Sequence, residues 1–520
     1  MGDFQLGLRG MGGILALAVV AICIWSTDAS VHEYVHEHFV GQGNAYIFFG
    51  GSEGIYASTS NANRSGIGNG RSYIRFDHSV TFTRTEEAAA KHAASEHKSG
   101  LVQAVVFDVA DRDLLGGSLY GGHLALCCTP DLARDVGCNQ GEVILRHNPE
   151  NAGSPKAINV FFRGNDLTTT MGVEEVKITK SGMYILYFVY CDPQLDGLMI
   201  DGKTVWKNPH GYLPGRMVAL MTFYGFMSLA YLALGLVWFL QYSRFWKDIL
   251  QLQNWITLVI GLGMTEMSFW YFDYANFNIR GGRPMGITIW AVTIGALKKT
   301  IARLLVLVVS MGYGVVRPTL GGLTSKVLLL GTTYFAALET MDVVEHVGRI
   351  DEMSNKTRLL LVLPVAILDA FFILWIFNSL SKTLEKLQAR KLVVKLELYR
   401  RFTNSLTLAV IASVAWIGYE LYFKASDPFG ENWQNAWVIS AFWNVVSFLL
   451  LCVLCVLWAP SQNSMRYAYS DESTEKFDED EAVGLTTGTL KNSFDIEKAV
   501  LKPDKEKKFG LDDTEEDKQE

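Results

Sequence analysis

Three basic residues lie inside one long apolar stretch, and their side chains could do chemistry within a membrane. The stretch runs from Ile287 to Pro318 and carries Lys298, Lys299 and Arg303 near its middle. It is long enough to cross a bilayer as a helix, but each central Lys or Arg costs roughly 2.5–3.5 kcal/mol to insert. Three unpaired cations would cost roughly 8–10 kcal/mol. We therefore expect this helix to lie inside a bundle, with acidic residues or water around its cations.

Acidic residues occur at matching depths on the neighbouring apolar segments. At a rise of 1.5 Å per residue, Lys299 lies about 21 Å from the far end of its helix. Glu266 on the preceding segment and Glu339 on the following one both lie at about 20 Å, with Asp342 one turn beyond Glu339. The spacing predicts that Lys299 faces these acids.

A second matched pair lies one turn further along. Arg303, at about 15 Å, matches Asp369 at about 16 Å. Lys299 and Arg303 share a helix face, whereas Lys298 points about 100° away. Two interpretations stay open, namely an ion-pair network that fixes helix register, and a polar cavity that binds a lipid headgroup, passes ions or senses protons. The candidate residues of this polar layer are Glu266, Lys298, Lys299, Arg303, Glu339, Asp342 and Asp369.

Seven apolar stretches must position these residues. They lie at approximately 215–242, 253–275, 287–313, 326–346, 358–380, 400–423 and 434–458, and we assign residues 212–460 to a seven-helix transmembrane bundle. Residues 1–29 are predicted to be a signal peptide, because Arg9 precedes an apolar run that ends in small residues. Export then places the next segment in the lumen. The loops predicted to be cytosolic carry eleven Lys and Arg, against six on the opposite side, as the positive-inside rule requires.

Residues 30–211 are predicted to form a lumenal β-sandwich. Short runs rich in Val, Ile, Phe and Tyr alternate with clusters of Gly, Asn, Asp and Ser, and they lie at 45–49, 73–82, 101–109, 157–163, 173–179 and 183–191. Residues 83–98 have the composition of one exposed helix or a charged loop. Asn63 and Asn355 begin N-x-S/T sequons and are candidate glycosylation sites. The predicted fold class is thus membrane α+β.

Four cysteines fall in the exported segment, and an even number in an oxidising compartment predicts two disulfides. The candidates are Cys127, Cys128, Cys138 and Cys191. A bridge between Cys127 and Cys128 is disfavoured, because the side chains of neighbouring strand residues point to opposite faces. Two connectivities remain, and the sequence does not choose between them.

One motif and several absent motifs bear on enzymatic function. His32 to His36 spell the H-E-x-x-H pattern of zinc proteases, which requires a helix, a third ligand and a cleft. Here the context is β-rich, so we predict an ordinary exposed start, or a weak metal-binding or pH-sensitive cluster with His38, and no metal centre. The sequence has no Gly-rich phosphate loop or nucleophile elbow, and we predict that the protein is not an enzyme.

The charge is concentrated at the C-terminal end. The chain has a formal net charge of −7. From Ala459 onward it has 17 Asp and Glu residues against 9 Lys and Arg residues, a net charge of −8. Residues 461–520 are therefore predicted to be a disordered acidic cytosolic tail. No basic patch with interleaved aromatic residues is present, so we predict no nucleic-acid partner.

Several segments together resemble a known family. They are FWKDIL at 245–250, LKKTIARLLVLVVSMGYGVVRP at 297–318, LPVAILD at 363–369, LYRRFTN at 398–404 and VLWAPS at 456–461. On these segments the chain resembles the GOLD-domain seven-transmembrane (lung seven-transmembrane receptor-like) family, in its transmembrane-protein-87 branch. The run at 181–191 looks like the late strand of that family's GOLD-like β-sandwich.

The resemblance implies a multi-pass Golgi membrane protein that acts in trafficking between endosomes and Golgi or as a cargo chaperone. It also implies a phospholipid in a bundle cavity lined by the polar layer, and no other cofactor. The expected partners are membrane lipids, membrane-protein cargo and cytosolic trafficking factors that bind the acidic tail. The alternatives are a pH- or voltage-influenced cation channel of the Golgi and G-protein-coupled receptor-like signalling. The receptor alternative is disfavoured, because 310–313 read SMGY where rhodopsin-type receptors have an Asp/Glu-Arg-Tyr motif.

Overall fold

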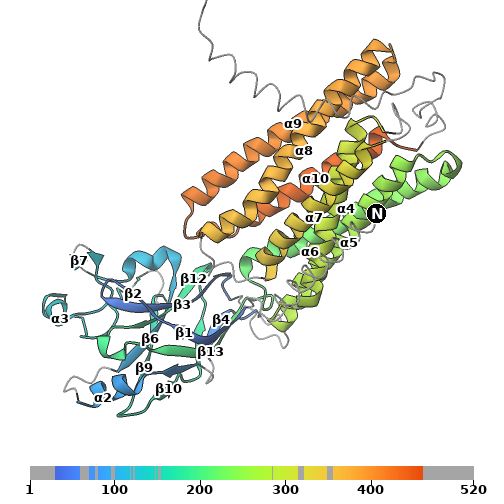
Figure 1. Ribbon diagram of the computed structural model, residues 1–520. Coiled ribbons are helices and arrows are strands. Elements are labelled where there is room, and N and C mark those ends of the chain that lie inside the picture. The colour runs from blue at the N-terminus through green and yellow to red at the C-terminus, as the bar shows by residue number, and fades with distance from the viewer. Residues whose placement is uncertain are drawn as a thin grey trace, which may run out of the picture.

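The computed structural model places a β-sandwich at one end of a helical bundle (Figure 1). It describes residues 30–58, 70–76, 80–94, 100–117, 119–120, 123–136, 138–146, 148–149, 154–283, 285–313, 321–347 and 355–460. The predicted signal peptide, the sequon residue Asn63 and the predicted acidic tail lie outside the described residues. We refer to the two described parts as the sandwich region and the helical region.

Two antiparallel sheets form the sandwich region. One has the strand order β10 (Thr168–Thr170), β5 (Thr81–Thr83), β13 (Met199–Lys207), β4 (Tyr73–Phe76) and β11 (Glu174–Lys177), with β1 (Val31–His38) also paired to β13. The other has the order β2 (Val40–Gln42), β3 (Ala45–Ile55), β12 (Gly182–Tyr190), β6 (Leu101–Asp108) and β9 (Lys156–Phe161). The shorter elements are α2 (Glu86–Ala94), η1 (Val109–Leu114), β7 (Leu119–Tyr120), β8 (His123–Leu124), α3 (Pro130–Val136) and η2 (Pro193–Leu195).

The predicted β-sandwich is confirmed, but its strands differ in part from the predicted runs. Strands β1 and β13 were not among the predicted runs, because His, Glu, Lys and Gly interrupt their apolar pattern. They pair with each other along most of their length. Within residues 83–98, Thr83 ends β5 and residues 86–94 form the helix α2, which begins with Glu86 and Glu87 at its positive end.

The core of the sandwich region explains why six of the eight residues of β6 are apolar. All eight residues of β6 are buried. Val102, Ala104 and Val106 belong to the core between the two sheets, together with Phe188 of β12. Val105 belongs to a second cluster on the outer face of the same sheet. A strand covered on both faces has no polar side, so it lacks the usual alternation of polar and apolar residues.

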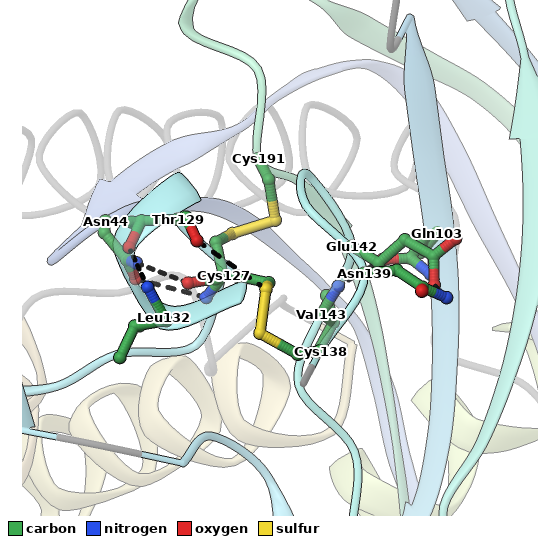
Figure 2. Close-up of a disulfide and its surroundings, with 11 residues drawn as sticks. Asn44, Gln103, Cys127, Thr129, Leu132, Cys138, Asn139, Glu142, Val143 and Cys191 are labelled. Atoms are coloured by element: carbon green, nitrogen blue, oxygen red, sulfur yellow. Dashed lines mark hydrogen bonds between the residues drawn. A yellow bond between two sulfur atoms is a disulfide. The ribbon is translucent and has the colours of Figure 1, made fainter. Parts of the chain in front are cut away.

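Two disulfides hold the segment that covers this outer face (Figure 2). Cys127 is bonded to Cys191, just after β12, with their Cα atoms 5.6 Å apart. Cys128 is bonded to Cys138, with Cα atoms 6.1 Å apart. The two disulfides expected from the cysteine count are therefore present. Of the two connectivities that the sequence left open, the structure has the one in which Cys127 joins the distant Cys191 and Cys128 joins the nearby Cys138.

Seven long helices make up the described part of the helical region. They are α4 (Gly215–Arg244), α5 (Gln251–Arg280), α6 (Met285–Ser310), α7 (Leu323–Val347), α8 (Asn355–Ala389), α9 (Val393–Ser426) and α10 (Trp437–Leu457), with a short turn η3 (Trp246–Asp248) after α4. Five of them, α4 and α7 to α10, are long and apolar enough to cross a membrane by length and composition. The other two, α5 and α6, carry buried charged residues along with their apolar ones.

The helices α8 and α9 are longer than the apolar stretches that predicted them. The prediction ended one stretch at residue 380 and began the next at 400, whereas α8 continues to Ala389 and α9 begins at Val393. Leu and Lys are the commonest of the added residues, and both favour helix, although Lys is not apolar. Hydropathy therefore detects only the apolar part of this hairpin, which extends beyond its neighbours at the upper right of Figure 1.

The sandwich region contacts the helical region at two places. Near the linker, the Asn278 side chain of α5 accepts a hydrogen bond from Leu213 N at 3.1 Å and donates one to the His210 carbonyl at 3.2 Å. Far along the chain, the loop between α9 and α10 inserts Trp433, which is buried against Val109 and Met183. The sandwich is thus attached both to α5 and to the loop between α9 and α10, and these attachments fix its orientation on the bundle.

The H-E-x-x-H segment lies on the strand β1, not on a helix. His32 Nε2 lies 3.0 Å from Glu53 Oε1, and His36 Nδ1 lies 2.9 Å from Asp201 Oδ1. The two histidines thus have separate carboxylate partners. Within the described residues no group of three or more His, Cys, Asp and Glu could hold a metal ion.

Candidate functional site

The helix α6 carries the three intramembrane cations, and each one contacts a different neighbouring helix. Lys298 pairs with Glu266 of α5, Lys299 with Asp342 of α7, and Arg303 with Asp369 of α8. A helix in the middle of a bundle is the one position from which side chains reach three partners at once. The polar layer is therefore centred on α6.

The pair of Lys298 and Glu266 is the buried part of the layer. The two side chains are 3% and 4% exposed, and they are in direct ion-pair contact. The Lys298 ammonium also lies 5.9 Å from the centre of the Tyr231 ring on α4. A Cβ atom on Gly295 would lie 2.8 Å from Glu266 Oε1, so the absence of a side chain there lets the carboxylate approach α6. Removing one partner would leave an uncompensated buried charge.

The pair of Lys299 and Asp342 is open on one side. Lys299 Nζ lies 2.8 Å from Asp342 Oδ2, yet the Lys299 side chain is 44% exposed, whereas that of Asp342 is 7% exposed. Glu339, one turn before Asp342, accepts a hydrogen bond from the Thr293 hydroxyl at 2.7 Å. Its second oxygen, Oε2, is buried and has no hydrogen-bond partner among the described residues.

The pair of Arg303 and Asp369 is more accessible still. Arg303 Nη2 lies 3.0 Å from Asp369 Oδ1, with side-chain exposures of 39% and 30%. The Tyr334 hydroxyl of α7 donates a hydrogen bond to the same oxygen at 3.1 Å. Lys299 and Arg303 therefore present partly neutralised cations side by side on one face of α6.

The observed pairing differs from the depth matching in two respects. Depth alone matched Lys299 with Glu266 and Glu339, but the structure pairs Glu266 with Lys298, and it pairs Lys299 with Asp342, one turn beyond Glu339. Adjacent residues differ by only about 1.5 Å in depth and by about 100° in direction. The identity of the partner is thus set by which side of α6 faces α5, and that is a property of the bundle. The structure does bring all seven candidate residues of the layer onto the four helices α5 to α8.

The sequence reasoning missed a second buried ion pair, nearer the sandwich. Arg283 Nε lies 3.0 Å from Asp273 Oδ2, and the Thr288 hydroxyl donates to Asp273 Oδ1 at 2.7 Å. The Arg283 guanidinium also lies 5.6 Å from the Trp270 ring centre. Asp273 follows Glu266 by seven residues, which is two helical turns, and this spacing on an apolar helix was the available signal.

This second pair is linked to the polar layer through His346 of α7. Arg283 Nη1 contacts the His346 carbonyl at 3.5 Å, and His346 Nδ1 lies 2.8 Å from the Asp342 carbonyl. The His346 ring packs on Trp270 with ring centres 4.9 Å apart. Polar groups therefore form a continuous series from Asp273, near the sandwich end, to Lys299 in the middle of α6.

The remaining sequence candidates lie elsewhere. The four predicted disulfide cysteines are in the sandwich region, away from the layer. Asn355 is the first residue of α8. Cys452 and Cys455 of α10 are free thiols, and Cys455 is buried.

A β-sandwich joined to a bundle of apolar helices with paired charges inside defines a multi-pass membrane protein of mixed α and β structure. Comparison with known families then shows what the chain is similar to. The family model described as "GOST, seven transmembrane domain" matches residues 219–465, a stretch that includes most of α4 and all of α5 to α10. In this region the chain is similar to the GOST family, and the transmembrane proteins 87A and 87B are relatives at 38% identity.

Named relatives fall into two levels of similarity. The chain is 38% identical to transmembrane protein 87A of Xenopus tropicalis over 278 residues, which cover 52% of this chain and 51% of the relative. It is 38% identical to transmembrane protein 87B of Homo sapiens over 314 residues, 59% of this chain and 56% of the relative. Membrane protein PTM1 of Saccharomyces cerevisiae is 23% identical over 406 residues, 73% and 74%. The chain thus spans about half the length of the 87A and 87B relatives that it matches.

Proposed function

We propose that this protein is a non-enzymatic Golgi membrane protein that acts in trafficking between endosomes and Golgi, or as a cargo chaperone, and that its bundle binds a phospholipid. The observation that carries the lipid part is the exposure of Lys299 and Arg303, at 44% and 39%, in the middle of an apolar helix. Cations at this depth are costly unless an anion or water faces them. A lipid phosphate supplies that anion.

The ion pairs explain how Lys299 and Arg303 would bind a phosphate and still remain neutralised inside the membrane when the phosphate dissociates. Asp342 and Asp369 each neutralise one cation from the buried side. Asp369 Oδ1 lies 3.0 Å from Arg303 Nη2, and a guanidinium carries five N–H donors, more than one carboxylate takes up. An Arg fork and a nearby ammonium match the oxygens of a phosphodiester. The site would thus take the headgroup while the acyl chains lie along the exposed apolar faces of α8, such as Ile367 and Phe371.

The test measures bound lipid directly. Protein purified in a mild detergent is analysed by native mass spectrometry and lipid extraction, as wild type and as the Lys299→Gln/Arg303→Gln variant. We expect about one phospholipid per chain in the wild type and at least a tenfold loss in the variant. Lys382→Gln, an exposed residue of α8 outside the layer, is the matched control. Equal lipid content in all three proteins would rule out this site.

The cellular part of the proposal has its own readout. A knockout should alter the glycosylation or delivery of other membrane proteins, and re-expression of the wild type should restore both. Normal cargo sorting in the knockout would remove the trafficking role. The lumenal position of the sandwich and the Golgi location belong to the same proposal, and selective protease digestion of sealed Golgi vesicles tests them.

A cation conductance is the second candidate, and Glu339 favours it. Its Oε2 atom is buried without a hydrogen-bond partner among the described residues, and Glu339 lies one helical turn before Asp342, which belongs to the series of polar groups from Asp273 to Lys299. A series of this kind could line a path for water and ions. Purified protein in planar bilayers decides the matter. Absence of current, or current unchanged by Glu339→Gln, would exclude this candidate.

A further inference from the structure

The turn between α8 and α9 carries a concentrated positive charge. Residues 382–401, here called the basic tip, contain seven Lys and Arg against two Glu, a net charge of +5. The basic residues are Lys382, Lys386, Arg390, Lys391, Lys395, Arg400 and Arg401. Most are exposed, including both residues of the turn itself, Arg390 and Lys391.

The basic tip also exposes an apolar patch at its end. Leu392, Val393 and Val394 are 40%, 74% and 65% exposed. About twenty helical residues cross the hydrocarbon of a bilayer, so a span that starts at Leu360 is complete near Leu380. The tip therefore lies past the hydrocarbon, in water, where exposed aliphatic side chains are not covered by lipid tails. A cationic surface with a small apolar centre fits an acidic segment that carries an apolar residue.

This chain contains such a segment close by. Residues 471–481 have the sequence DESTEKFDEDE, with seven acidic residues, one Lys and a central Phe477. The last described residue is Pro460. Just before it, the Trp458 ring lies 5.2 Å from that of Phe402 and 6.3 Å from that of Tyr399 on α9. The acidic tail thus starts beside the basic tip, on the same side of the bundle.

The lengths allow the contact. Val393 is six residues from Tyr399 along α9, or about 9 Å. The ten residues 461–470 span up to about 33–36 Å when extended. A tether of this length gives an effective concentration in the millimolar range, so even a weak contact in solution would be largely formed within the chain.

We propose that the acidic segment 471–481 docks on the basic tip of the α8–α9 hairpin within the same molecule. The Asp and Glu side chains pair with the Lys and Arg of the tip, and Phe477 covers Leu392 to Val394. The contact covers the tip and occupies the acidic segment at once, so any cytosolic factor that binds either one must first displace the other. The proposal depends on neither the lipid site nor the trafficking role.

A photo-crosslink tests the docking in the full-length chain. A photoreactive amino acid replaces Val393, and the protein is reconstituted in phosphatidylcholine nanodiscs, irradiated and mapped by mass spectrometry. We expect crosslinks to residues 471–481 in at least fivefold excess over residues 504–517, which carry acids mixed with Lys. The same photoreactive residue at Leu167, exposed on the sandwich, is the control and should give no crosslinks to the tail.

Charge reversal separates a specific contact from chance proximity. Arg390→Glu/Lys391→Glu should reduce the crosslinks at least fivefold, and adding Asp478→Lys/Glu479→Lys should restore them. The changed residues are exposed or outside the described residues, and an unchanged melting temperature verifies that the fold is kept. Crosslinks to lipid in place of the tail would assign the tip to the membrane surface and overturn the proposal. Crosslinks spread evenly along the tail, or unaffected by the reversal, would overturn it as well.

Discussion

Trp433, in the loop between α9 and α10, packs its indole ring against the backbone of Gly54 in β3. A Cβ atom on Gly54 would lie 2.5 Å from the ring, closer than any side chain permits. A Cβ atom on Gly215, the first residue of α4, would lie 2.6 Å from the same ring. The Tyr56 ring stands edge-on to the indole, with ring centres 4.9 Å apart. Residues from the sandwich and from the start of α4 thus form a socket for Trp433, which lies just before α10.

Substitutions at this socket should loosen the contact between the sandwich region and the loop that joins α9 to α10. We expect Trp433→Ala to lower the free energy of unfolding by about 3–5 kcal/mol, since a large buried aromatic is lost. Gly54→Ala should cost about 1–3 kcal/mol through overpacking. Denaturant unfolding and hydrogen exchange in residues 427–436 measure both. Trp443→Ala, a half-exposed tryptophan of α10, is the control. If it costs as much as Trp433→Ala, the socket has no special role.

The buried ion pair in the bundle gives a second prediction. Lys298→Met leaves the Glu266 carboxylate buried without its partner and should destabilise the protein by about 3–5 kcal/mol. The double variant Lys298→Met/Glu266→Gln should recover most of that loss, because no charge remains unpaired. Thermal unfolding in detergent measures the difference.

The exposed pair supplies the contrast to this buried one. Lys299→Met leaves Asp342 with a route to water and should destabilise the protein less than Lys298→Met, because the Lys299 side chain is 44% exposed. A larger effect of Lys299→Met would contradict the assigned burial.

The two disulfides should differ in their contribution to stability. Cys127 and Cys191 are 64 residues apart, whereas Cys128 and Cys138 are 10 apart. In the chain-entropy model, the longer loop adds about 1.6 kcal/mol more at 25 °C. Paired Ser substitutions and melting curves test the order. A larger loss from the Cys128/Cys138 pair would show that strain or packing, and not loop length, decides.

A buried carboxyl near the socket predicts a pH effect. Burial is the main cause that raises the pKa of Asp108 above 3.8, and nearby Asp111 adds to it. A carboxyl with a raised pKa in the folded state costs stability where it is ionised. That cost is lost as the pH falls through the raised value. We expect Asp108→Asn to stabilise the sandwich near pH 7, with a gain that shrinks as the pH approaches 4.

The Asn side chain can still accept the hydrogen bond that Ala110 N donates to Asp108 Oδ1 at 3.3 Å. The substitution therefore removes the negative charge and keeps the hydrogen bond. Melting temperatures of both proteins between pH 4 and pH 8 provide the measurement. A difference that stays constant over this range would show that Asp108 does not titrate there.

The sequence by itself determined the broad organisation of this protein. Short runs rich in Val, Ile, Phe and Tyr between clusters of Gly, Asn, Asp and Ser indicated the sandwich. Apolar stretches of about twenty residues indicated the helices. Both signals are local. The cost of central cations also required acids at matching depths, and depth matching supplied Glu266, Glu339 and Asp369. Family similarity in the helical region reflects the same local patterns.

Only the tertiary structure decided which groups meet. Lys298 and Lys299 are adjacent and chemically identical, and their partners on α5 and α7 follow from the rotation of α6 in the bundle. The same holds for the connectivity of Cys127 and Cys128, and for Trp433, whose socket joins residues almost 400 positions apart. Helix rotation and loop packing depend on side chains far apart in the chain, and no local pattern records them.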